Sequence, residues 1–509
     1  MSAVRRATAV AAPHPASVAA AAAAVRRGGN AIDAALAAAA VLTVVYPHQC
    51  ALGGDLIALV RVPGQDGATA VLSAGAQPAG LDIGALAGAP MPRRGIHTVT
   101  VPGVVAGWSA LAGIGAALPL GDALTEAAVL ARDGIEVSEG LARGLTGQRS
   151  TVLADPGLRA VFAPTGEIAG PGDVIRQPAL AATLSELVAD PDSFYRGPVA
   201  ARIAAGLAAL GGDHTAADLA AHRPEVAPAL ERRCGAGRWW AAPPPSQGAL
   251  LLGVLPVALA AGRAAAGADP LVAECVRAMA VRDRELGDPR GGPIDVEAMI
   301  DLADADGVRS PPSGRALGDT VAISAVDTDG RAICLIQSVF QTFGAGLLEP
   351  GTGIVLHNRG AAFSTDPRSP GALRPGTRPP HTLCPAIVAS AGRLLALGCQ
   401  GGRAQPWILA QVAADLVTAE IPAAQVLARP RWVVGASDLG HDRTVLVAEP
   451  GTARAVAAAA ALGIPVIEAE GPADEAGHVQ VAVLDTARGL PHAATDPRAD
   501  GRAAVIEGP

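Results

Sequence analysis

Residues 318–338 read GDTVAISAVDTDGRAICLIQS, and this stretch decides the fold. Two runs of alternating apolar and small or polar residues, 321–327 and 332–338, flank an Asp-Gly pair. Such runs joined around Asp-Gly are the strongest short-range signal for a β-hairpin. Because the two strands of a hairpin run antiparallel, Ser338 at the end of the second strand is expected near Thr320 at the start of the first.

Thr320 is a candidate nucleophile because of what precedes it. It follows Gly318 and Asp319, the end of a turn-rich segment, 309–319, that we expect to be exposed and flexible. If the Asp319–Thr320 peptide bond were cut, Thr320 would carry both a hydroxyl group and a free α-amine. An α-amine with an ordinary pKa of about 8 can act as the general base for its own hydroxyl. Spacing alone favours an ordinary threonine at the start of a strand.

The pair Gly401-Gly402 is a candidate anion site. It lies between a predicted strand that ends near Gly398 and a predicted helix that begins at Pro406. Backbone N–H groups on such a turn can hold an anion, including the oxyanion of a tetrahedral intermediate. Loss of one oxyanion donor costs about 3 kcal/mol of transition-state stabilisation. In isolation, an ordinary turn from strand to helix explains the pair better.

The remaining pattern predicts an α+β protein. The N-terminal part predicts two helices, the second capped by Asn30, and then a strand. The middle of the chain is mainly helical by pattern, and the C-terminal part predicts sheet with flanking helices. The predicted helices are 16–27, 31–45 and 406–418, the helical middle is 105–300, and the predicted strands are 56–62, 353–357, 384–390 and 393–398.

Composition excludes several classes of protein. The chain has 509 residues, half of them apolar, and a formal net charge of −8, so it lacks the electrostatic footprint of a nucleic-acid-binding protein. It contains no lysine, which excludes a P-loop, a pyridoxal phosphate enzyme and a Schiff-base aldolase. The six cysteines form no C-x-x-C motif and the ten histidines show no metal-ligand spacing, so no metal site is predicted.

The N-terminal region and the apolar stretches predict a cytoplasmic protein. Pro13 and Pro15 interrupt the apolar residues near the start, so no signal peptide is expected. The apolar stretch 249–261 is too short to span a membrane and contains Pro256. We therefore expect neither a membrane nor a nucleic acid as partner.

A series of short motifs extends along nearly the whole chain. They are GGNAIDAA (28–35), YPHQCALGGD (46–55), VPGVVAGW (101–108), DGIEVS (133–138), FYRGPVA (194–200), PPPSQG (243–248), GDTVAISAVDTDG (318–330), FGAG (343–346), GTGIVLHNR (351–359), PGTRP (375–379) and GCQGG (398–402). In these motifs the chain resembles the γ-glutamyltransferase (γ-glutamyltranspeptidase) family of N-terminal nucleophile hydrolases.

The resemblance implies a four-layer αββα sandwich made as one precursor. It implies self-cleavage before Thr320 into a helix-rich large subunit, 1–319, and a small subunit, 320–509, which together form one intertwined unit. Thr320 would then attack an amide carbonyl and form an acyl-enzyme that water or an amine resolves. Ser338 matches a hydroxyl residue that hydrogen-bonds the nucleophile. Gly401 and Gly402 match the oxyanion glycines, and no cofactor is implied.

The sequence departs from the family where the family binds the α-amino acid part of its substrate. The family's arginine for the α-carboxylate falls in LSAGAQP (72–78), at about Ala74, and its aspartate for the α-amine falls at Ala362. The family's pair of serines corresponds to His381 and Thr382. A buried carboxylate or ammonium without a partner is costly, so an unmodified γ-glutamyl donor is expected to bind poorly.

Two arginines are candidates to replace this clamp. Arg359 stands where the family commonly has glutamine, and Arg403 follows the oxyanion glycines. An arginine fork suits a carboxylate, so either could hold an acidic or amide-bearing acyl group that lacks the α-amine. Structural ion pairs are an equal alternative for both.

The resemblance and its departures predict an autoprocessing amidohydrolase or acyltransferase with divergent acyl specificity. Its substrate would be a small amide or a γ-glutamyl-like molecule. One alternative is a true γ-glutamyl hydrolase or transpeptidase acting on glutathione-like donors. A second alternative is a non-catalytic scaffold that never matures.

Overall fold

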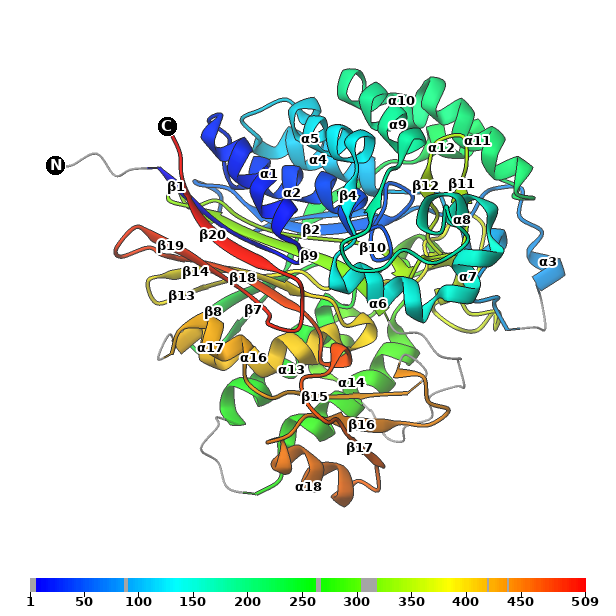
Figure 1. Ribbon diagram of the computed structural model, residues 1–509. Helices are drawn as coiled ribbons and strands as arrows, with labels where there is room; N and C mark the ends of the chain where they lie inside the picture. The colour runs from blue at the N-terminus through cyan, green and yellow to red at the C-terminus, as the bar shows by residue number, and fades with distance from the viewer. Residues whose placement is uncertain (1–5, 87–89, 262–266, 304–317, 419–420, 437–438) are drawn as a thin grey trace.

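Two antiparallel sheets lie face to face in the computed structural model, which describes residues 6–86, 90–261, 267–303, 318–418, 421–436 and 439–509. The first sheet has seven strands in the order β20-β1-β9-β10-β2-β3-β6 (Figure 1). Its strands are β1 (Ala7–Ala12), β2 (Asp55–Arg61), β3 (Thr69–Ser73), β6 (Glu225–Pro228), β9 (Gly318–Asp327), β10 (Ala332–Gln341) and β20 (Arg502–Glu507).

The second sheet has six strands in the order β19-β18-β14-β13-β8-β7. They are β7 (Leu230–Cys234), β8 (Gly237–Ala241), β13 (Ala386–Ser390), β14 (Arg393–Cys399), β18 (Val479–Asp485) and β19 (Leu490–Thr495). Both sheets therefore combine strands from before and after residue 319.

Helices cover the outer face of each sheet (Figure 1). On the first sheet lie α1 (Pro15–Arg26), α2 (Ala31–Val45) and α4 (Val104–Gly115). Outside them, α5 (Leu120–Asp133) packs on α2, and α9 (Pro178–Ala189) packs on α5. On the second lie α13 (Gly248–Ala261) and α16 (Gln405–Thr418), and α14 (Pro270–Glu285) and α15 (Val296–Asp301) pack on α13. The order helix, sheet, sheet, helix confirms the predicted four-layer αββα sandwich.

The other elements are short and lie around these layers. The helices are α3 (Ile83–Leu86), α6 (Glu139–Gly147), α7 (Arg149–Ala154), α8 (Pro156–Phe162), α10 (Ser193–Arg196), α11 (Pro198–Ala209), α12 (Ala216–Ala221), α17 (Ala423–Leu427) and α18 (Ala453–Ala461). The strands are β4 (Ile135–Glu136), β5 (Val174–Ile175), β11 (Leu348–Glu349), β12 (Ile354–Val355), β15 (Trp432–Gly435), β16 (Val445–Ala448) and β17 (Val466–Glu468). Two 3-10 turns matter below, η3 (Arg359–Ala362) and η4 (Gly402–Ala404).

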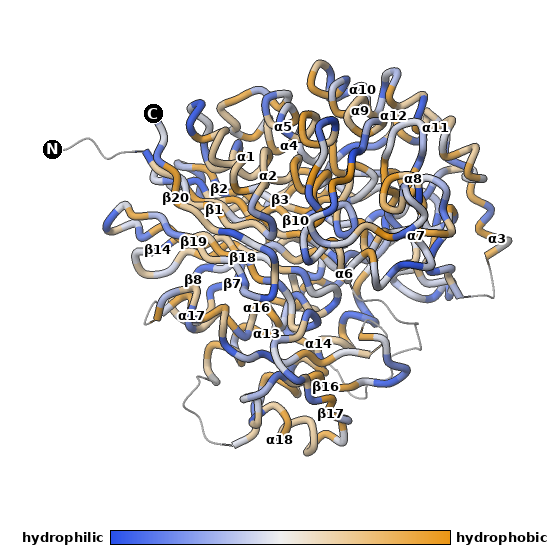
Figure 2. Tube along the Cα trace, in the orientation of Figure 1, coloured by the Kyte–Doolittle hydropathy of each residue, from blue (hydrophilic) through white to orange (hydrophobic). Residues whose placement is uncertain are grey.

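The hairpin β9–β10 is buried on both faces. Val321 and Ile323 belong to the hydrophobic core under α1 and α2, whereas Ala322 belongs to the core between the sheets. Successive side chains of a strand point to opposite faces, and here both faces are covered, so both sets are apolar or small. Figure 2 shows this as mainly hydrophobic strands between the helical layers.

The predicted elements around this hairpin are largely confirmed. The helices predicted over 16–27, 31–45 and 406–418 are α1, α2 and α16 within a residue or two, and Asn30 and Asp33 form the capping box of α2. The strand predicted over 353–357 is only the two-residue β12. The mainly helical middle also contains the strands β6, β7 and β8, which the apolar pattern did not predict.

The expectation of an exposed, flexible Gly318-Asp319 is wrong for Asp319, which is half-buried. Both residues belong to β9, where Asp319 pairs with Phe340 and its carboxylate accepts a hydrogen bond from Thr342 Oγ1. The partner strand β10 continues to Gln341 and supplies these bonds, which the local sequence does not reveal. The rest of the turn-rich segment, from 309 to 317, lies outside the described residues.

The motif Gly53-Gly54-Asp55 has a steric explanation. A Cβ atom on Gly54 would lie 2.4 Å from the carbonyl oxygen of Ser338, so only glycine lets the start of β2 approach the end of β10 this closely. The approach brings Asp55 to the same end of the sheet as Ser338, which its register partner confirms.

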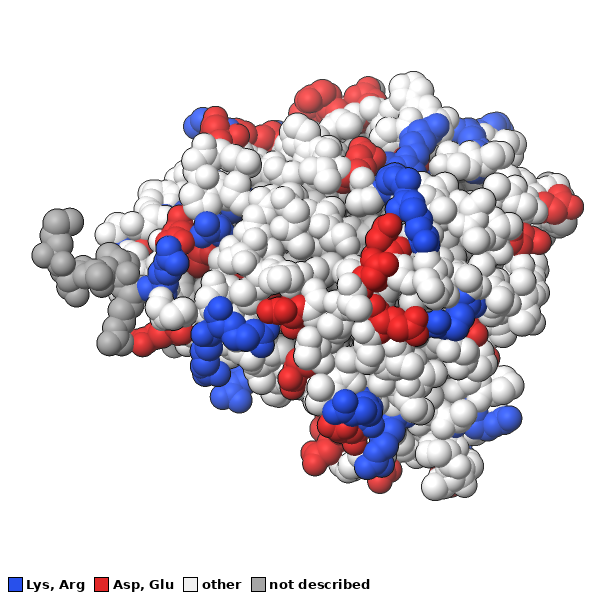
Figure 3. Space-filling view, turned by 90° about the horizontal axis from the view of Figure 1, so that it is seen from above, with Lys and Arg blue, Asp and Glu red and all other residues white. Residues whose placement is uncertain are grey.

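The described helices include none long and apolar enough to cross a membrane. On the face seen in Figure 3, acidic and basic side chains are interspersed.

Candidate active site

Thr320 lies near the start of β9 and is linked by hydrogen bonds to the peptide group before it. Thr320 is 2% exposed, and its Oγ1 donates to Ser338 Oγ at 3.1 Å. Ser338 Oγ donates to the carbonyl oxygen of Asp319 at 2.6 Å and accepts from the N–H of Phe340 at 2.8 Å. A single serine therefore connects the hydroxyl of Thr320 with the carbonyl of the preceding residue.

The end of β10 is irregular where it meets Thr320. The register between β9 and β10 shifts between Gln337 and Phe340, and Phe340 has a φ of 78°. Positive φ is uncommon for a bulky side chain, and bulges often lie beside active sites because they redirect side chains. The expected proximity of Ser338 and Thr320 is therefore present, with a bulge that the alternating sequence did not predict.

The pair Gly401-Gly402 forms the turn between β14 and α16, and η4 lies against β9. Both glycines have positive φ, 146° and 54°. Within the described part of the chain, neither N–H group donates a hydrogen bond to the protein. The two groups are free donors at a turn before a helix, an arrangement suited to an oxyanion.

A cleft of about 950 Å³ opens at this point, and Asp319, Gly401 and Gly402 all line it. Burial raises the pKa of the Asp319 carboxyl to about 6, against the hydrogen bond from Thr342. Burial lowers the pKa of His48, on another wall, to about 3, so its imidazole is neutral at physiological pH. The cleft thus reaches both the residue before Thr320 and the two free N–H groups.

Arg359, His381 and Thr382 lie together in a buried cluster around Asp55. Nη1 of Arg359 donates to Thr382 Oγ1 at 3.3 Å, and its guanidinium lies 4.0 Å from the centre of the Phe340 ring. Asp55 Oδ2 lies 3.3 Å from His381 Nε2 and 3.8 Å from Arg359 Nε. Phe340 joins this cluster to Ser338, because the same residue donates its N–H to that hydroxyl.

The charges of the cluster follow from burial and mutual contact. Burial opposes ionisation of Asp55, but His357 and His381 outweigh it and hold the pKa of its carboxyl below the ordinary value. Burial lowers the pKa of Arg359 to about 10 although Asp55 acts in the opposite direction, so Arg359 stays charged. Burial and the charge of Arg359 lower the pKa of His381 to about 3. Asp55 is therefore an anion and Arg359 a cation within the cluster.

Arg403 is not part of this cluster. Its Nη2 donates to Asp283, which also lies 3.6 Å from Arg282 Nη1. Arg282 donates to Gln247 Oε1 at 3.1 Å, and Gln247 Nε2 donates to the carbonyl oxygen of Gly402 at 3.0 Å. These contacts fit a structural role, in which Arg403 supports the glycine turn.

Several residues of the site could not be singled out from sequence. Asp55 and Gln247 lie in motifs of the family resemblance, but nothing in their spacing predicts which atoms they contact. The contacts of Phe340 and Thr342 depend on the bulge in β10. Among the described residues, no group of three or more His, Cys, Asp or Glu side chains could hold a metal ion.

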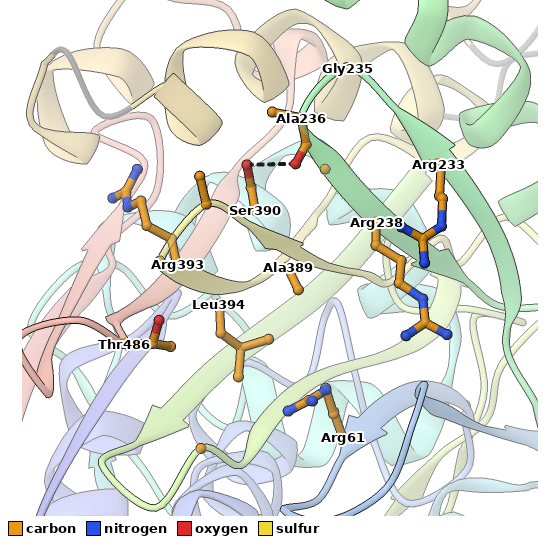
Figure 4. A pocket seen from close by; sticks show the side chains of 14 residues that line it. Arg61, Arg233, Gly235, Ala236, Arg238, Ala389, Ser390, Arg393, Leu394 and Thr486 are labelled. Carbon is orange, nitrogen blue, oxygen red and sulfur yellow. Dashed lines mark hydrogen bonds between the residues drawn. The ribbon is translucent and has the colours of Figure 1, made fainter.

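A second pocket, of about 490 Å³, lies at the other end of the sandwich (Figure 4). Four arginines line it, namely Arg61, Arg233, Arg238 and Arg393, and Arg238 forms ion pairs with Asp66 and Glu231. Gly330, in the hairpin turn of β9–β10, also lines the pocket, whereas Thr320 lies at the opposite end of the hairpin. The pocket is therefore remote from the hydroxyl groups and free N–H donors described above.

Two facing sheets between helical layers, with a threonine at the start of a central strand and free N–H donors beside it, define the N-terminal nucleophile hydrolase class. The family model for gamma-glutamyltranspeptidase matches residues 17–506, and the chain belongs to this family. It is therefore an enzyme of the γ-glutamyltransferase branch of that class.

Three bacterial proteins are similar to this chain. The chain is 38% identical to an oxamate amidohydrolase proenzyme of Klebsiella pneumoniae over 94% of each chain. It is 32% identical to a glutathione hydrolase-like proenzyme of Bacillus subtilis over 80% of this chain and 81% of the relative. A crystal structure of cephalosporin acylase from Bacillus halodurans matches with a TM-score of 0.85 and 28% identity, over 98% of this chain and 96% of the acylase.

Proposed function

We propose that this protein is an autoprocessing amidohydrolase that uses Thr320 as nucleophile and has an acyl specificity different from that of γ-glutamyl enzymes. The observation that carries the proposal is the continuous contact from Thr320 Oγ1 through Ser338 Oγ to the carbonyl oxygen of Asp319, beside the free N–H groups of Gly401 and Gly402. An ordinary threonine at the start of a strand requires none of these neighbours.

In the proposed self-cleavage, Thr320 Oγ1 attacks the carbonyl carbon of Asp319. The proton of Thr320 passes to Ser338 Oγ, and the proton of Ser338 passes to the carbonyl oxygen, so no net charge develops. The hydroxyl group of this intermediate then gives its proton back, through Ser338, to the nitrogen of Thr320. The C–N bond breaks as the carbonyl reforms, which leaves an ester and the free α-amine of Thr320. Hydrolysis of the ester yields a large subunit, 1–319, and a small subunit, 320–509.

In turnover, the new α-amine of Thr320 accepts the proton of its own hydroxyl, which attacks the amide carbonyl of the substrate. The N–H groups of Gly401 and Gly402 stabilise the oxyanion, and the amine product leaves with the proton. Water then hydrolyses the acyl-enzyme, or an amine accepts the acyl group. None of these steps needs a metal ion or an organic cofactor.

The acyl specificity differs because the clamp for an α-amino acid is missing. Ala74 and Ala362 occupy the positions that resemble the family's arginine and aspartate, and an alanine binds neither a carboxylate nor an ammonium group. The likeness to an oxamate amidohydrolase supports a small amide as substrate. We assign Arg359, His381 and Thr382 to the acyl side of the site, and we exclude Arg403 because it pairs with Asp283.

The test is a comparison of substrates with the purified protein and with Thr320→Ala. Ammonia release is measured with oxamate and succinamate, and p-nitroaniline release with γ-glutamyl-p-nitroanilide. We expect ammonia release that Thr320→Ala abolishes, and little p-nitroaniline.

Two other outcomes identify the alternatives. Rapid p-nitroaniline release that depends on Thr320 would identify a γ-glutamyl enzyme. A single intact chain without activity on any of these amides would identify a scaffold that does not mature.

A further inference from the structure

The buried cluster beside the proposed nucleophile contains hydrogen-bonding atoms that the protein does not satisfy. Nε and Nη2 of Arg359 are buried and have no hydrogen-bond partner among the described residues. The nearest carboxylate oxygen, Oδ2 of Asp55, lies 3.8 Å from Nε, which is too long for a hydrogen bond. A fully buried guanidinium with two unused donors is costly unless a ligand uses them.

The two unused donors form one edge of the guanidinium. A second buried arginine of this protein shows what that edge binds: Nε of Arg378 lies 3.1 Å from Asp288 Oδ2, and its Nη2 lies 2.7 Å from Asp288 Oδ1. In Arg359 the Phe340 ring covers one face of the guanidinium, and Nη1 donates a hydrogen bond to Thr382. The edge formed by Nε and Nη2 is the part of the guanidinium without a hydrogen-bond partner among the described residues. Such an edge matches a carboxylate in a bidentate pair.

Gln77 adds a second unsatisfied side chain, beside the turn that carries Arg359. Both Oε1 and Nε2 of Gln77 are buried and lack a hydrogen-bond partner among the described residues. Gly360 follows Arg359 in η3, and a Cβ atom on it would lie 2.5 Å from Gln77 Nε2. Asp55 contacts both the segment that leads to Gln77 and the turn η3. Its Oδ1 accepts a hydrogen bond from the N–H of Gly75 at 3.4 Å, and its Oδ2 faces Arg359. Gln77 therefore lies against η3, the turn that carries Arg359.

We propose that Arg359 and Gln77 bind the acyl part of the substrate, and that the substrate is a short primary amide with a carboxylate close to the amide carbonyl and no ammonium group. This inference rests on the proposed function. The carboxylate would pair with Nε and Nη2 of Arg359 and accept a further hydrogen bond from Gln77 Nε2. The amide carbonyl would then face Thr320.

The short acyl chain follows from how near Arg359 is to the nucleophile. Phe340 covers the guanidinium with its ring and donates its own N–H to Ser338 Oγ, the group that contacts Thr320. Two residues in contact, Phe340 and Ser338, therefore link the carboxylate receptor to the reacting hydroxyl. The positive φ of Phe340 is a strain that this placement explains.

The experiment compares oxamate with pyruvamide, in which a methyl group replaces the carboxylate oxygen anion and the amide is kept. Ammonia release gives kcat/KM for both substrates in the mature protein and in Arg359→Gln and Gln77→Ala. We expect Arg359→Gln to lower kcat/KM for oxamate by about 100-fold, through loss of a charged bidentate pair, and for pyruvamide by less than about threefold. Gln77→Ala should lower only the oxamate value, by about 10-fold.

Arg378→Gln and Gln177→Ala are matched controls, because both residues are buried but already hydrogen-bonded, Arg378 to Asp288 and Gln177 to the carbonyl oxygen of Val44. The ratio of the two kcat/KM values should not change in either variant. The appearance of two chains by mass spectrometry shows that a variant has folded well enough to mature. If Arg359→Gln does not mature, Gln77→Ala and Arg359→Lys provide the same ratio.

An oxamate-to-pyruvamide ratio that is unchanged in Arg359→Gln or Arg359→Lys and in Gln77→Ala would overturn the inference. So would a mature protein that hydrolyses pyruvamide or γ-glutamyl-p-nitroanilide but not oxamate. Both results leave the role of Thr320 intact. Failure of the proposed function is seen differently, as a protein that does not cut before Thr320 or that releases ammonia from oxamate equally well after Thr320→Ala.

Discussion

Asp319 is the residue where the proposed cut and the cleft meet. Its carbonyl oxygen accepts from Ser338, whereas its carboxylate accepts from Thr342 and faces the cleft. Burial raises the pKa of this carboxyl from 3.8 to about 6, so the fold favours its neutral form. The unbroken chain therefore holds a carboxyl group that is less stable as an anion than it would be in water.

This pKa shift predicts how the stability of the unbroken chain depends on pH. Because the folded-state pKa is raised from 3.8 to about 6, the Asp319 carboxyl lowers the unfolding free energy progressively between about pH 4 and about pH 6, and by a constant amount above that. We compare Thr320→Ala, which cannot cut, with Thr320→Ala combined with Asp319→Asn. From about pH 4 to about pH 8, the asparagine variant should gain on the order of 2 kcal/mol in unfolding free energy relative to its parent.

Urea unfolding at the two pH values measures this difference directly. All other carboxyl groups are common to the two proteins, so their titration cancels. An unfolding free energy that differs between the two variants by the same amount at both pH values would show that Asp319 titrates normally in the fold.

At the scale of elements, sequence predicted what depends on neighbours along the chain. Asn30 and the apolar residues after it predicted α2. The alternation of apolar with small or polar residues on both sides of Asp329-Gly330 predicted the hairpin of β9 and β10. The strands β6 to β8 were not predicted, because β7 and β8 gain their stability by pairing with each other and with the distant β13. Pairing between remote segments leaves little trace in local pattern.

The same distinction applies to the candidate site. The hairpin pattern placed Ser338 near Thr320, and a strand-to-helix turn marked Gly401 and Gly402. The family resemblance, and not the local pattern, brought these residues together as one site. Sequence could not show that the Nε–Nη2 edge of Arg359 and the amide of Gln77 lack hydrogen-bond partners. Which buried polar groups find partners depends on the folded structure. Sequence left the same two roles open for Arg359 and Arg403, a substrate contact or a structural ion pair. The ion pair of Arg403 with Asp283 distinguishes the two arginines.

At the scale of the whole molecule, cleavage would not separate the two pieces. In the first sheet, β1 lies between β20 and β9, so a strand from before the cut pairs with two strands from after it. In the second sheet, β8 pairs with β13 across the same division. Hydrogen-bonded ladders and the shared core between the sheets hold the pieces together.

The mature protein should therefore elute as one particle. Size-exclusion chromatography of the cut protein and of Thr320→Ala should give the same elution volume, while a denaturing gel resolves two chains only in the first. Separate elution of the two chains without denaturant would contradict the interleaved strands.

The intact mass of the purified protein tests the central claim most directly. We predict two polypeptides, residues 1–319 and 320–509, the smaller with a free N-terminal threonine, and a single chain of 50.4 kDa in Thr320→Ala. An active wild-type protein that consists of one unbroken chain, or that is cut at another bond, would contradict Thr320 as the nucleophile.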